Sequence, residues 1–461
     1  MPLLGAFIVP HPPIILPEIG KGEEKKIKAT IESYHEVAKQ IAALKPDTII
    51  LTTPHSIMYS DYFHISPGES AKGNFGRFGA GKVSFQVEYD EEFVENLEAC
   101  AEKNGIEAGT LGEKDPSLDH GTMVPLYFIN QYLNSYQLVR IGLSGLSILD
   151  HYQLGRCITD TAQKLDRRIV FVASGDLSHK LKEDGPYGIA KEGAQFDKEV
   201  TEAINKADFL KFMEFSPDFC EAAAECGLRS FIIMAGALSG MSVNPKLLSY
   251  EGPFGVGYAV GSFEITGLDE NRHFDTVYEH KQREITLEKR KNEDAYIKLA
   301  RLSLETYITT GKYAKSPEDL PEEMRKQKAG VFVSLKKFGQ LRGCIGTIAP
   351  VTDNIAKEII RNAVSAGVED PRFPPVKEEE LFDIVYSVDV LMEPEPIETI
   401  DELDVKRYGV IVSSGRKRGL LLPNLEGVDS VQQQVLIARK KAGIYDNEHF
   451  TMERFEVVRH T

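Results

Sequence analysis

Residues 5–20 read GAFIVPHPPIILPEIG, an apolar run that ends at a histidine held between two prolines. The run does not alternate between polar and apolar residues, which is typical of a strand covered on both faces of a sheet. Proline restricts the backbone on each side of His11 and so limits where its ring can lie. The stretch therefore predicts a buried strand that brings His11 to the end of a sheet.

Three further runs have the same character, at residues 47–53 (DTIILTT), 136–144 (YQLVRIGLS) and 167–174 (RRIVFVAS). Helical patterns lie between them, at residues 22–46 and 121–135. Alternation of strands and helices indicates an α/β fold of three layers, in which helices cover both faces of a central sheet.

A change of pattern near residues 261–266 predicts a domain boundary. A highly charged stretch follows, LDENRHFDTVYEHKQREITLEKRKNED. We expect a first domain over residues 1–268, a charged linker or helix over 269–292, and a second domain over 293–461. The sequence pattern of the second domain predicts an α+β fold with a mainly antiparallel sheet, in which residues 330–347 (GVFVSLKKFGQLRGCIGT) form a hairpin.

Composition excludes several classes of protein. The formal net charge of −16 argues against a nucleic-acid-binding protein. Apolar runs stay short of the roughly 20 residues that span a bilayer, and no basic segment precedes the first of them, so we expect neither a membrane anchor nor a signal peptide. The five cysteines form no CxxC pair, which predicts a reducing compartment, the cytoplasm.

Histidines follow the predicted strands at similar places. His11, His55 and His179 each come just after a strand, and His120 precedes a helix that Asp119 or Thr122 could cap. Ligands of open α/β sheets bind outside the carboxyl ends of the strands, so we expect these four rings to converge there. The remaining histidines of this domain, His35, His64 and His151, are expected to have structural roles.

Convergent imidazoles suit Fe, Zn, Cu or Ni. A third ligand is expected from the segment FCEAAAECGLRS, where Glu225 and Cys226 are neighbours. Adjacent residues of a helix point about 100° apart, so one of the two is expected to face the metal. A carboxylate gives a hard, oxygen-activating site and a thiolate a softer one, and the sequence leaves both open. Asp176 is expected to cap the helix after its strand, the alternative being to orient His179.

The motifs VPHPPIILPEIG, TTPHS, LDHGTMVPL, ASGDLSHKL and YEGPFGVGYAVGSFE resemble the class III extradiol dioxygenase (LigB-like) family and its sister Memo family, over about residues 1–266. The resemblance implies that His11 and His55 bind Fe²⁺ (alternatively Cu or Zn), with Glu225 as third ligand in the dioxygenase pattern and Cys226 in the Memo pattern. It further implies that His179 is the acid–base group, that His120 assists, that the substrate is a catechol and that O₂ is the cosubstrate.

The second domain resembles the AMMECR family over about residues 295–460, through LRGCIG, DPRFPP, YGVIV, GLLLPN and ARKKAGI. Its candidate site residues are Cys344 as a nucleophile and Arg342 as an anion contact. A buried structural role for Cys344 is the alternative, since cysteine is among the most buried residue types.

The two resemblances together suggest the AmmeMemoRadiSam system, which implies a separate radical SAM protein as partner. We therefore expect a metal-dependent oxidoreductase that resembles extradiol ring-cleavage dioxygenases. The alternatives are a non-catalytic, Memo-like metal- or peptide-binding scaffold joined to an AMMECR adaptor, and, more weakly, a metal-dependent hydrolase. A homo-oligomer is compatible with the sequence.

Overall fold

The computed structural model describes residues 2–425, 428, 430–445 and 447–461. The chain divides into two compact units, Met1–Tyr278 and Glu279–Thr461, and each is described by itself. Within the described residues, no helix is both long and apolar enough to cross a membrane.

The first unit is built on a six-stranded sheet with the order β7-β2-β8-β1-β10-β9. Its strands are β1 (Leu3–Val9), β2 (Thr48–Thr53), β7 (Gln137–Gly142), β8 (Ile169–Ser174), β9 (Met241–Glu251) and β10 (Tyr258–Leu268). The four strands β7, β2, β8 and β1 run parallel, while β10 and β9 are antiparallel to their neighbours. The carboxyl ends of the four parallel strands therefore lie at one edge of the sheet.

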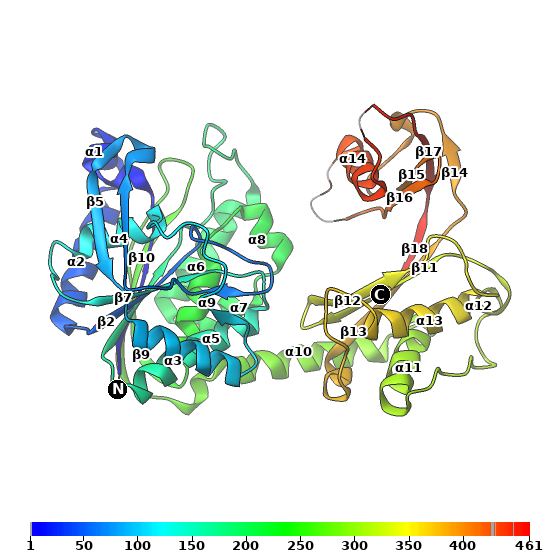
Figure 1. Cartoon of the computed structure of the whole chain (residues 1–461), viewed down its shortest axis with the longest axis horizontal. Coiled ribbons are helices and arrows are strands. Elements are labelled where there is room, and N and C mark those ends of the chain that lie inside the picture. Colours follow the sequence, from blue (N-terminus) through cyan, green and yellow to red (C-terminus); the bar gives the residue numbers. More distant parts are fainter. Residues whose placement is uncertain (1, 426–427, 429, 446) are drawn as a thin grey trace. The chain divides into compact units, whose positions relative to one another are not determined.

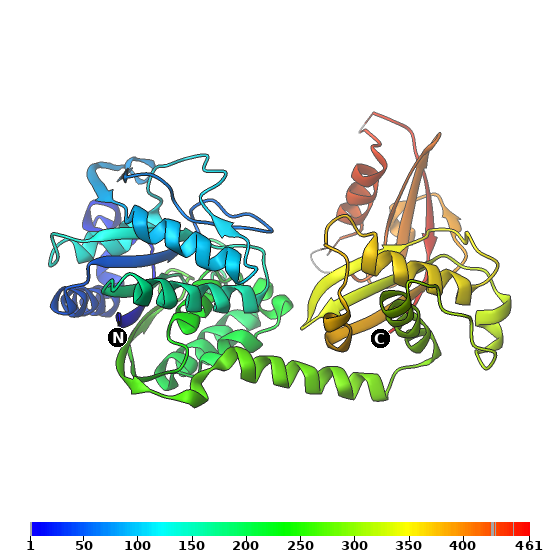
Figure 2. The same ribbon diagram turned by 60° about the horizontal axis from the view of Figure 1, so that its bottom comes forward.

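Helices cover both faces of this sheet (Figures 1 and 2). They are α1 (Pro17–Gly20), α2 (Lys28–Leu44), α3 (Glu91–Lys103), α4 (His120–Ile129), α5 (Ile148–Lys164), α6 (Lys191–Lys206), α7 (Phe209–Glu214), α8 (Pro217–Ala223) and α9 (Leu228–Ala237). Helix α2 packs against α4 and β1, whereas α5 packs against α9, which contacts β8. This is the three-layer arrangement that the alternating sequence pattern predicts.

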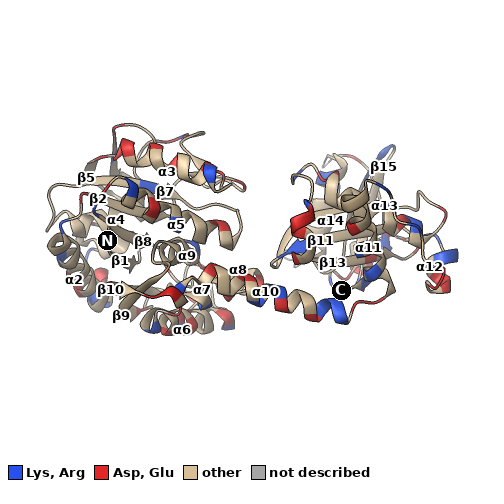
Figure 3. Cartoon of the chain, turned by 90° about the horizontal axis from the view of Figure 1, so that it is seen from below, with Lys and Arg blue, Asp and Glu red and all other residues tan. Residues whose placement is uncertain are grey.

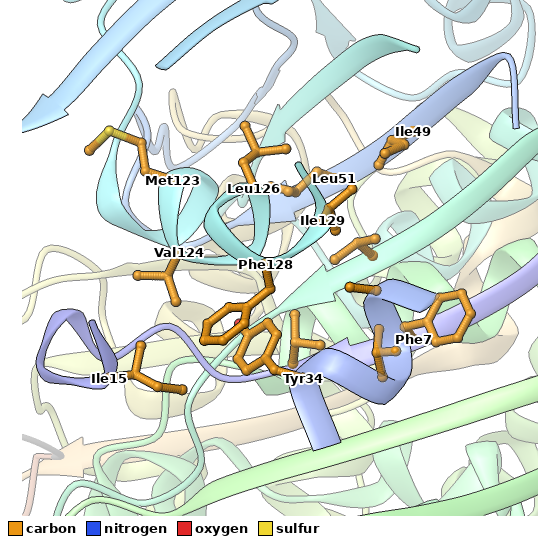
Figure 4. Close-up of a cluster of buried hydrophobic side chains, with 14 of the residues drawn as sticks. Phe7, Ile15, Tyr34, Ile49, Leu51, Met123, Val124, Leu126, Phe128 and Ile129 are labelled. Atoms are coloured by element: carbon orange, nitrogen blue, oxygen red, sulfur yellow. The ribbon is translucent and has the colours of Figure 1, made fainter. Parts of the chain in front are cut away.

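A buried apolar cluster joins α2 and α4 to the sheet (Figure 4). Tyr34 of α2 and Phe128 of α4 stack with ring centroids 4.3 Å apart, and Phe7 of β1 belongs to the same cluster. Burying side chains of this kind stabilises a fold by about 1.5–3 kcal/mol each. The Tyr34 hydroxyl also donates a hydrogen bond to the carbonyl of Pro10, so this core holds the backbone just before His11.

Four further strands of the first unit lie outside the main sheet. They form a parallel pair, β3 (Phe63–His64) with β6 (Ala108–Gly109), and an antiparallel hairpin, β4 (Ser70–Phe75) with β5 (Ala80–Glu88). The 3-10 turn η3 (Gly76–Phe78) joins the two strands of the hairpin. This hairpin lines the cleft described below.

The second unit contains two four-stranded antiparallel sheets, with the orders β12-β11-β13-β18 and β14-β17-β15-β16. Its strands are β11 (Val331–Lys337), β12 (Gln340–Gly346), β13 (Ile384–Leu391), β14 (Glu395–Ile397), β15 (Gly409–Ser414), β16 (Lys417–Leu421), β17 (Thr451–Phe455) and β18 (Val457–His460). Its helices are α11 (Ala295–Thr310), α12 (Glu322–Lys326), α13 (Ile355–Val368) and α14 (Val431–Ala442). Helices α11 and α13 pack on the first sheet and α14 on the second. The predicted α+β fold and the β11–β12 hairpin are confirmed.

The charged stretch between the predicted domains forms the helix α10 (Phe274–Lys291), and the division between the units falls within it. Side chains of both signs occur along it, and three basic residues stand together at its end (Figure 3). The predicted helices differ from the structure at both ends. Helix α2 begins only at Lys28, after a 3-10 turn over Glu23–Ile27, and it ends at Leu44 because Lys45 is left-handed at φ 50°. Helix α4 begins one residue earlier than expected, at His120, and ends at Ile129, with Asn130 as its C-cap.

Candidate metal centre

Three parallel strands each place a polar residue two positions beyond their end. His11 follows Val9 of β1, His55 follows Thr53 of β2, and Asp176 follows Ser174 of β8. The strands are in register, since Val9 pairs with Ser174. These side chains consequently meet at the carboxyl edge of the sheet, where open α/β folds bind their ligands.

Two histidines and a cysteine form the centre of this cluster. The Nε2 atoms of His11 and His55 lie 2.9 Å apart, and the Sγ of Cys226 lies 3.7 Å from His11 Nε2. All three donor atoms lie within 4.8 Å of one another, close enough to share one ion. Imidazole nitrogen and thiolate sulfur are the donors of Zn, Cu and some Fe sites.

The hydrogen bonds of Ser174 fix the proton of the buried His11 ring. The Ser174 hydroxyl donates to the carbonyl of Gly121 at 2.6 Å, so it must accept from Nδ1–H of His11, 2.9 Å away. The lone pair of His11 is therefore on Nε2, which faces His55 and Cys226. A polar partner on the far nitrogen is the usual way in which proteins orient a metal-binding imidazole.

Close contact between two glycines brings Cys226 to the histidines. A Cβ atom on Gly175 would lie 2.2 Å from the Cα of Gly227, so neither backbone can approach so closely with a larger residue. Gly175 follows β8 directly and Gly227 follows Cys226. This packing carries the Cys226 thiol to the end of the sheet, where it is also 4.0 Å from His179 Nε2.

Glu225, the other expected third ligand, does not join the cluster. Its Oε2 atom accepts a hydrogen bond of 2.7 Å from the backbone N–H of Leu228, the first residue of α9. Residues 224–227 are a turn and not part of a helix, so the 100° spacing expected for helical neighbours does not apply. The loop itself turns the thiol toward the histidines and the carboxylate toward the start of α9.

Asp176 belongs to the cluster, and its predicted role as a helix cap is wrong. No helix begins between β8 and Lys191 of α6. Its Oδ1 accepts from the backbone N–H of His11 at 2.8 Å, and its Oδ2 lies 3.9 Å from His11 Nε2 and 4.0 Å from His179 Nε2. Burial raises the pKa of this carboxyl to about 7, although the His11 N–H opposes the shift. Its position directly after a strand was the available sequence signal.

His179 and His120 lie on two sides of the ligand group. The Nδ1–H of His179 donates to the carbonyl of Ala224 at 2.5 Å, which leaves a free lone pair on Nε2. The ring of His120 stacks on that of His55, with centroids 4.0 Å apart. His120 is the first residue of α4, and of the two expected caps it is Asp119 that caps this helix, by accepting from the N–H of Thr122.

Burial keeps all four rings neutral. It lowers the pKa of His11 well below its usual value, with the neighbouring histidines adding to the effect, and it lowers the pKa of His55 to about 4. The pKa values of His120 and His179 are also lowered, chiefly by burial. Neutral imidazoles are the form that binds metal. Burial raises the pKa of the Cys226 thiol, so an ion would have to displace its proton. The donor set therefore fits a metal ion.

A cleft of about 1140 Å³ opens beside His55 and His120. The β4–β5 hairpin and the segment from Lys114 to Asp119 supply most of its lining. Phe78, on the turn of the hairpin, lies with its ring centroid 5.4 Å from that of His120. The cleft thus gives a ligand access to the edge of the histidine cluster.

The other three histidines predicted in this domain lie outside the cluster, and the two ring nitrogens of His64 have no hydrogen-bond partner among the described residues. His151 is buried with Nδ1 at 2.8 Å from the carbonyl of Ser147, and His35 lies 3.1 Å from the Tyr132 hydroxyl. His64 is buried on β3.

The two candidates of the second unit have structural partners. The Cys344 N–H donates to Asp370 at 2.9 Å and its Sγ accepts from the Ser334 hydroxyl at 3.1 Å. Arg342 donates to both carboxylate oxygens of Glu380, at 3.0 and 2.9 Å, so its charge is already paired instead of serving an outside anion. His460, the histidine of β18, bonds to Asp294.

Comparison with known families matches residues 5–261 to the catalytic LigB subunit of aromatic ring-opening dioxygenase and residues 297–460 to AMMECR1. A protein of Clostridium acetobutylicum is 46% identical over 477 residues, covering 100% of this chain and 99% of its own. A protein of Thermotoga maritima is 51% identical over 171 residues, covering 36% of this chain and 98% of its own. The crystal structure of an uncharacterized protein from Pyrococcus horikoshii has 34% identity and a TM-score of 0.33, covering 36% of this chain and 88% of that one. The chain therefore belongs to the LigB family and carries an AMMECR1 domain after its LigB domain.

Proposed function

We propose that the LigB domain is a metal-dependent oxidoreductase that holds its ion with His11, His55 and Cys226. The observation that carries the proposal is the convergence of these three donors within 4.8 Å at the carboxyl edge of the sheet. A bound ion would act as a Lewis acid toward a substrate oxygen and would take part in electron transfer, with O₂ as cosubstrate. The family resemblance favours Fe²⁺, while the thiolate also suits Cu or Zn.

His179 is the base of the proposed reaction. Its free Nε2 lies 4.0 Å from the Cys226 sulfur, where it can accept a proton from a hydroxyl held at the cluster. The Ala224 carbonyl holds the opposite nitrogen and stabilises the imidazolium that forms. His120 lies across the cluster against His55 and would return a proton to the product.

A small catechol-like aromatic is the substrate class that this arrangement supports best. Phe78 and Phe85 line the cleft that leads to His55 and His120, and they offer apolar surface to a ring. Ring centroids of aromatic pairs lie about 4.5–7 Å apart, so a planar substrate can pack on Phe78 while its hydroxyl reaches the histidines.

A non-catalytic metal-binding role is the second candidate. It is favoured by one observation, that the Cys226 thiol and not the Glu225 carboxylate faces the histidines. A thiolate makes the site softer than a site of two histidines and one carboxylate, the set typical of non-haem Fe(II) oxygenases.

Two measurements distinguish the oxidoreductase from the non-catalytic metal-binding role. They are metal analysis after anaerobic purification and O₂ uptake with a panel of catechols. Uptake that requires both the ion and His179, and that is lost in His179→Gln with metal content unchanged, supports the oxidoreductase. A fully Fe²⁺-loaded protein without uptake contradicts ring cleavage and leaves the metal-binding role. The variant Cys226→Glu gives a further arm, because a carboxylate there should shift the metal preference toward Fe²⁺.

A radical SAM protein of the AmmeMemoRadiSam system is the partner that we propose for this chain. The order of the LigB and AMMECR1 domains supports this association, and the chain itself has no CxxxCxxC triplet for an iron–sulfur cluster. The five cysteines are free thiols, which supports a cytoplasmic location. Analytical ultracentrifugation of the chain alone and mixed with the radical SAM protein tests both the partner and a homo-oligomer.

A further inference from the structure

Two free cysteines face each other across two helices of the LigB domain, outside the metal centre. Cys100 lies in α3 and Cys157 in α5, and these two helices pack against each other. The metal centre takes its sulfur from Cys226. The other two thiols are therefore nucleophilic groups that the proposed function does not use.

Contacts along the interface of α3 and α5 place the two cysteines opposite each other. The Asn96 side-chain oxygen accepts from Nζ of Lys164, the last residue of α5, at 2.7 Å. About two turns further along, Asn104 Nδ2 lies 3.6 Å from the Sγ of Cys157, so the two helices are antiparallel. Cys100 lies midway between the two asparagines. Since residues four apart share a face of a helix, its side chain also faces α5.

The Asn104 side chain contacts both sulfurs at the end of α3. Its Nδ2 donates to the carbonyl of Cys100 at 2.8 Å and lies 3.7 Å from the Sγ of the same residue. The two thiols also contact each other, because burial and then a hydrogen bond with Cys100 raise the pKa of Cys157. A disulfide forms only between cysteine side chains that face each other at short range, and this pair meets that condition.

The two thiols differ in their access to solvent. Cys100 is half-buried, whereas Cys157 is only 2% exposed. A small oxidant from solvent therefore meets Cys100 first. Redox-sensitive cysteines are typically accessible thiols that lie beside a second, resolving cysteine. This arrangement gives the first role to Cys100 and the second to Cys157.

We propose that Cys100 and Cys157 form a reversible disulfide when the chain meets hydrogen peroxide. The Cys100 sulfur attacks one peroxide oxygen, the O–O bond breaks, and the leaving hydroxide takes the thiol proton, which gives a sulfenic acid and water. The Cys157 sulfur then attacks the Cys100 sulfur, so that an S–S bond forms and the S–O bond breaks. The second hydroxide leaves with the Cys157 proton as water. The two thiols are oxidised and the peroxide is reduced, and neither step depends on the proposed function of the metal centre.

The disulfide would tie α3 to α5 by closing a loop of about 60 residues. Cross-links of this span stabilise a folded domain, in the chain-entropy account by restricting the unfolded chain. We expect the oxidised chain to have a Tm that is higher by about 5 °C or more. The stability of the LigB domain would therefore depend on redox conditions.

Peptide mapping of the full chain by mass spectrometry tests the proposal. Reduced protein is treated with stoichiometric hydrogen peroxide and digested without reducing agent, while a second portion is reduced again before digestion. Cys157→Ala removes the resolving thiol and keeps a small apolar side chain in its buried place. The matched control is Cys220→Ala, which removes another thiol of the same domain outside the metal centre. Thermal unfolding is measured on the same samples.

We expect wild type and Cys220→Ala to yield cross-linked peptides that contain Cys100 and Cys157, and to lose both the cross-link and the rise in Tm on reduction. In Cys157→Ala both should be absent, and dimedone should label Cys100 as a sulfenic acid. Absence of the cross-link in oxidised wild type, or its formation only after unfolding in urea, overturns the proposal. The map of wild type gives this result directly, so it does not depend on the stability of a variant. A cross-link without a rise in Tm overturns the stabilising effect.

Discussion

Polar residues gather beyond the carboxyl ends of the parallel strands in the LigB domain and beside the edge strand β12 in the AMMECR1 domain. Their ionisation is affected in opposite ways. In the LigB domain, burial raises the pKa values of Asp176 and Glu225 to about 7 and lowers that of His55 to about 4. In the AMMECR1 domain, the Arg372 guanidinium holds the pKa of Asp370 at about 2. Burial acts against ionisation of Glu380 there, yet hydrogen bonds and charge from Arg342 and its neighbours lower its pKa to about 2.

The difference separates a cluster whose polar groups can still bind a ligand from a network whose charged groups are paired with one another. The Asp370 carboxylate accepts the N–H of Cys344, and Arg372 donates to the Cys344 carbonyl, so together they occupy backbone groups of the edge strand β12. Among the described residues, no lysine or arginine pairs with the Asp176 carboxylate, and the Nε2 atoms of His11 and His55 face each other at 2.9 Å. Unpaired buried groups of this kind are typical of functional sites.

The largest expected effect is on metal retention. His55→Ala removes one of three donors and should lower metal affinity by about 100-fold or more, because even outer partners of a metal ligand are worth about 10–100-fold. Mass-spectrometric metal analysis of purified protein measures this loss. His35→Ala is the control, since His35 lies at the domain surface against Tyr132. Unchanged metal content in His55→Ala would contradict the ligand assignment.

The next largest expected effect is a loss of folding stability when a tightly packed glycine of the cluster is enlarged. Gly227→Ala places a Cβ 2.6 Å from Phe231 and 2.8 Å from the carbonyl of Asp176, which should lower the free energy of unfolding by about 3 kcal/mol. Urea denaturation, followed by hydrogen exchange in peptides of α9, reports it. Gly267→Ala is matched, because nothing lies within 4 Å of its added Cβ. Equal stability of the two variants would argue against a tight contact.

In acid, the free energy of unfolding of the AMMECR1 domain is expected to fall by about 2 kcal/mol. The pKa of Asp370 is lower in the folded chain, so its ionisation contributes stability above about pH 4 that is lost as pH falls toward 2. Asp370→Asn keeps an acceptor for the Cys344 N–H and should remove this dependence. Hydrogen exchange in β12 between pH 2 and 5 measures it, with the exposed Asp319→Asn as control. A dependence that survives in Asp370→Asn would show that other groups cause it.

Cys344→Ser should have the smallest effect. A serine hydroxyl can still accept the hydrogen bond from Ser334, so we expect a loss of less than about 1 kcal/mol and no change in bound metal. Cys226→Ser in the same assays should lose metal, as the thiolate is replaced by a poor ligand. Thermal unfolding and metal analysis of both variants make the comparison. A large change of activity in Cys344→Ser alone would restore Cys344 as a nucleophile.

The positions of His11 and His55 could be predicted because they depend on local features. A strand without alternation, followed by a proline and a histidine, is enough to indicate the carboxyl edge of a parallel sheet, and the central sheet follows from the same pattern. The hairpin and the α+β architecture of the AMMECR1 domain could likewise be predicted from alternation and turn residues.

The choice between Glu225 and Cys226 could not be predicted, because it depends on contact between Gly175 and Gly227, which are far apart in the sequence. Asp176 was misassigned for a similar reason. An aspartate after a strand resembles a helix cap, and only the long loop before Lys191 frees it to bond to His11. The β4–β5 hairpin that lines the cleft was also missed, since its role depends on where it packs.

The Ser174 hydroxyl links the metal ligand to the first turn of a helix. It accepts from His11 and donates to the carbonyl of Gly121, the second residue of α4. An ion that immobilises the His11 ring would also restrain this hydroxyl and, through it, the start of α4. Metal binding should therefore slow amide hydrogen exchange in the first turn of α4, the helix that supplies His120 to the same cleft.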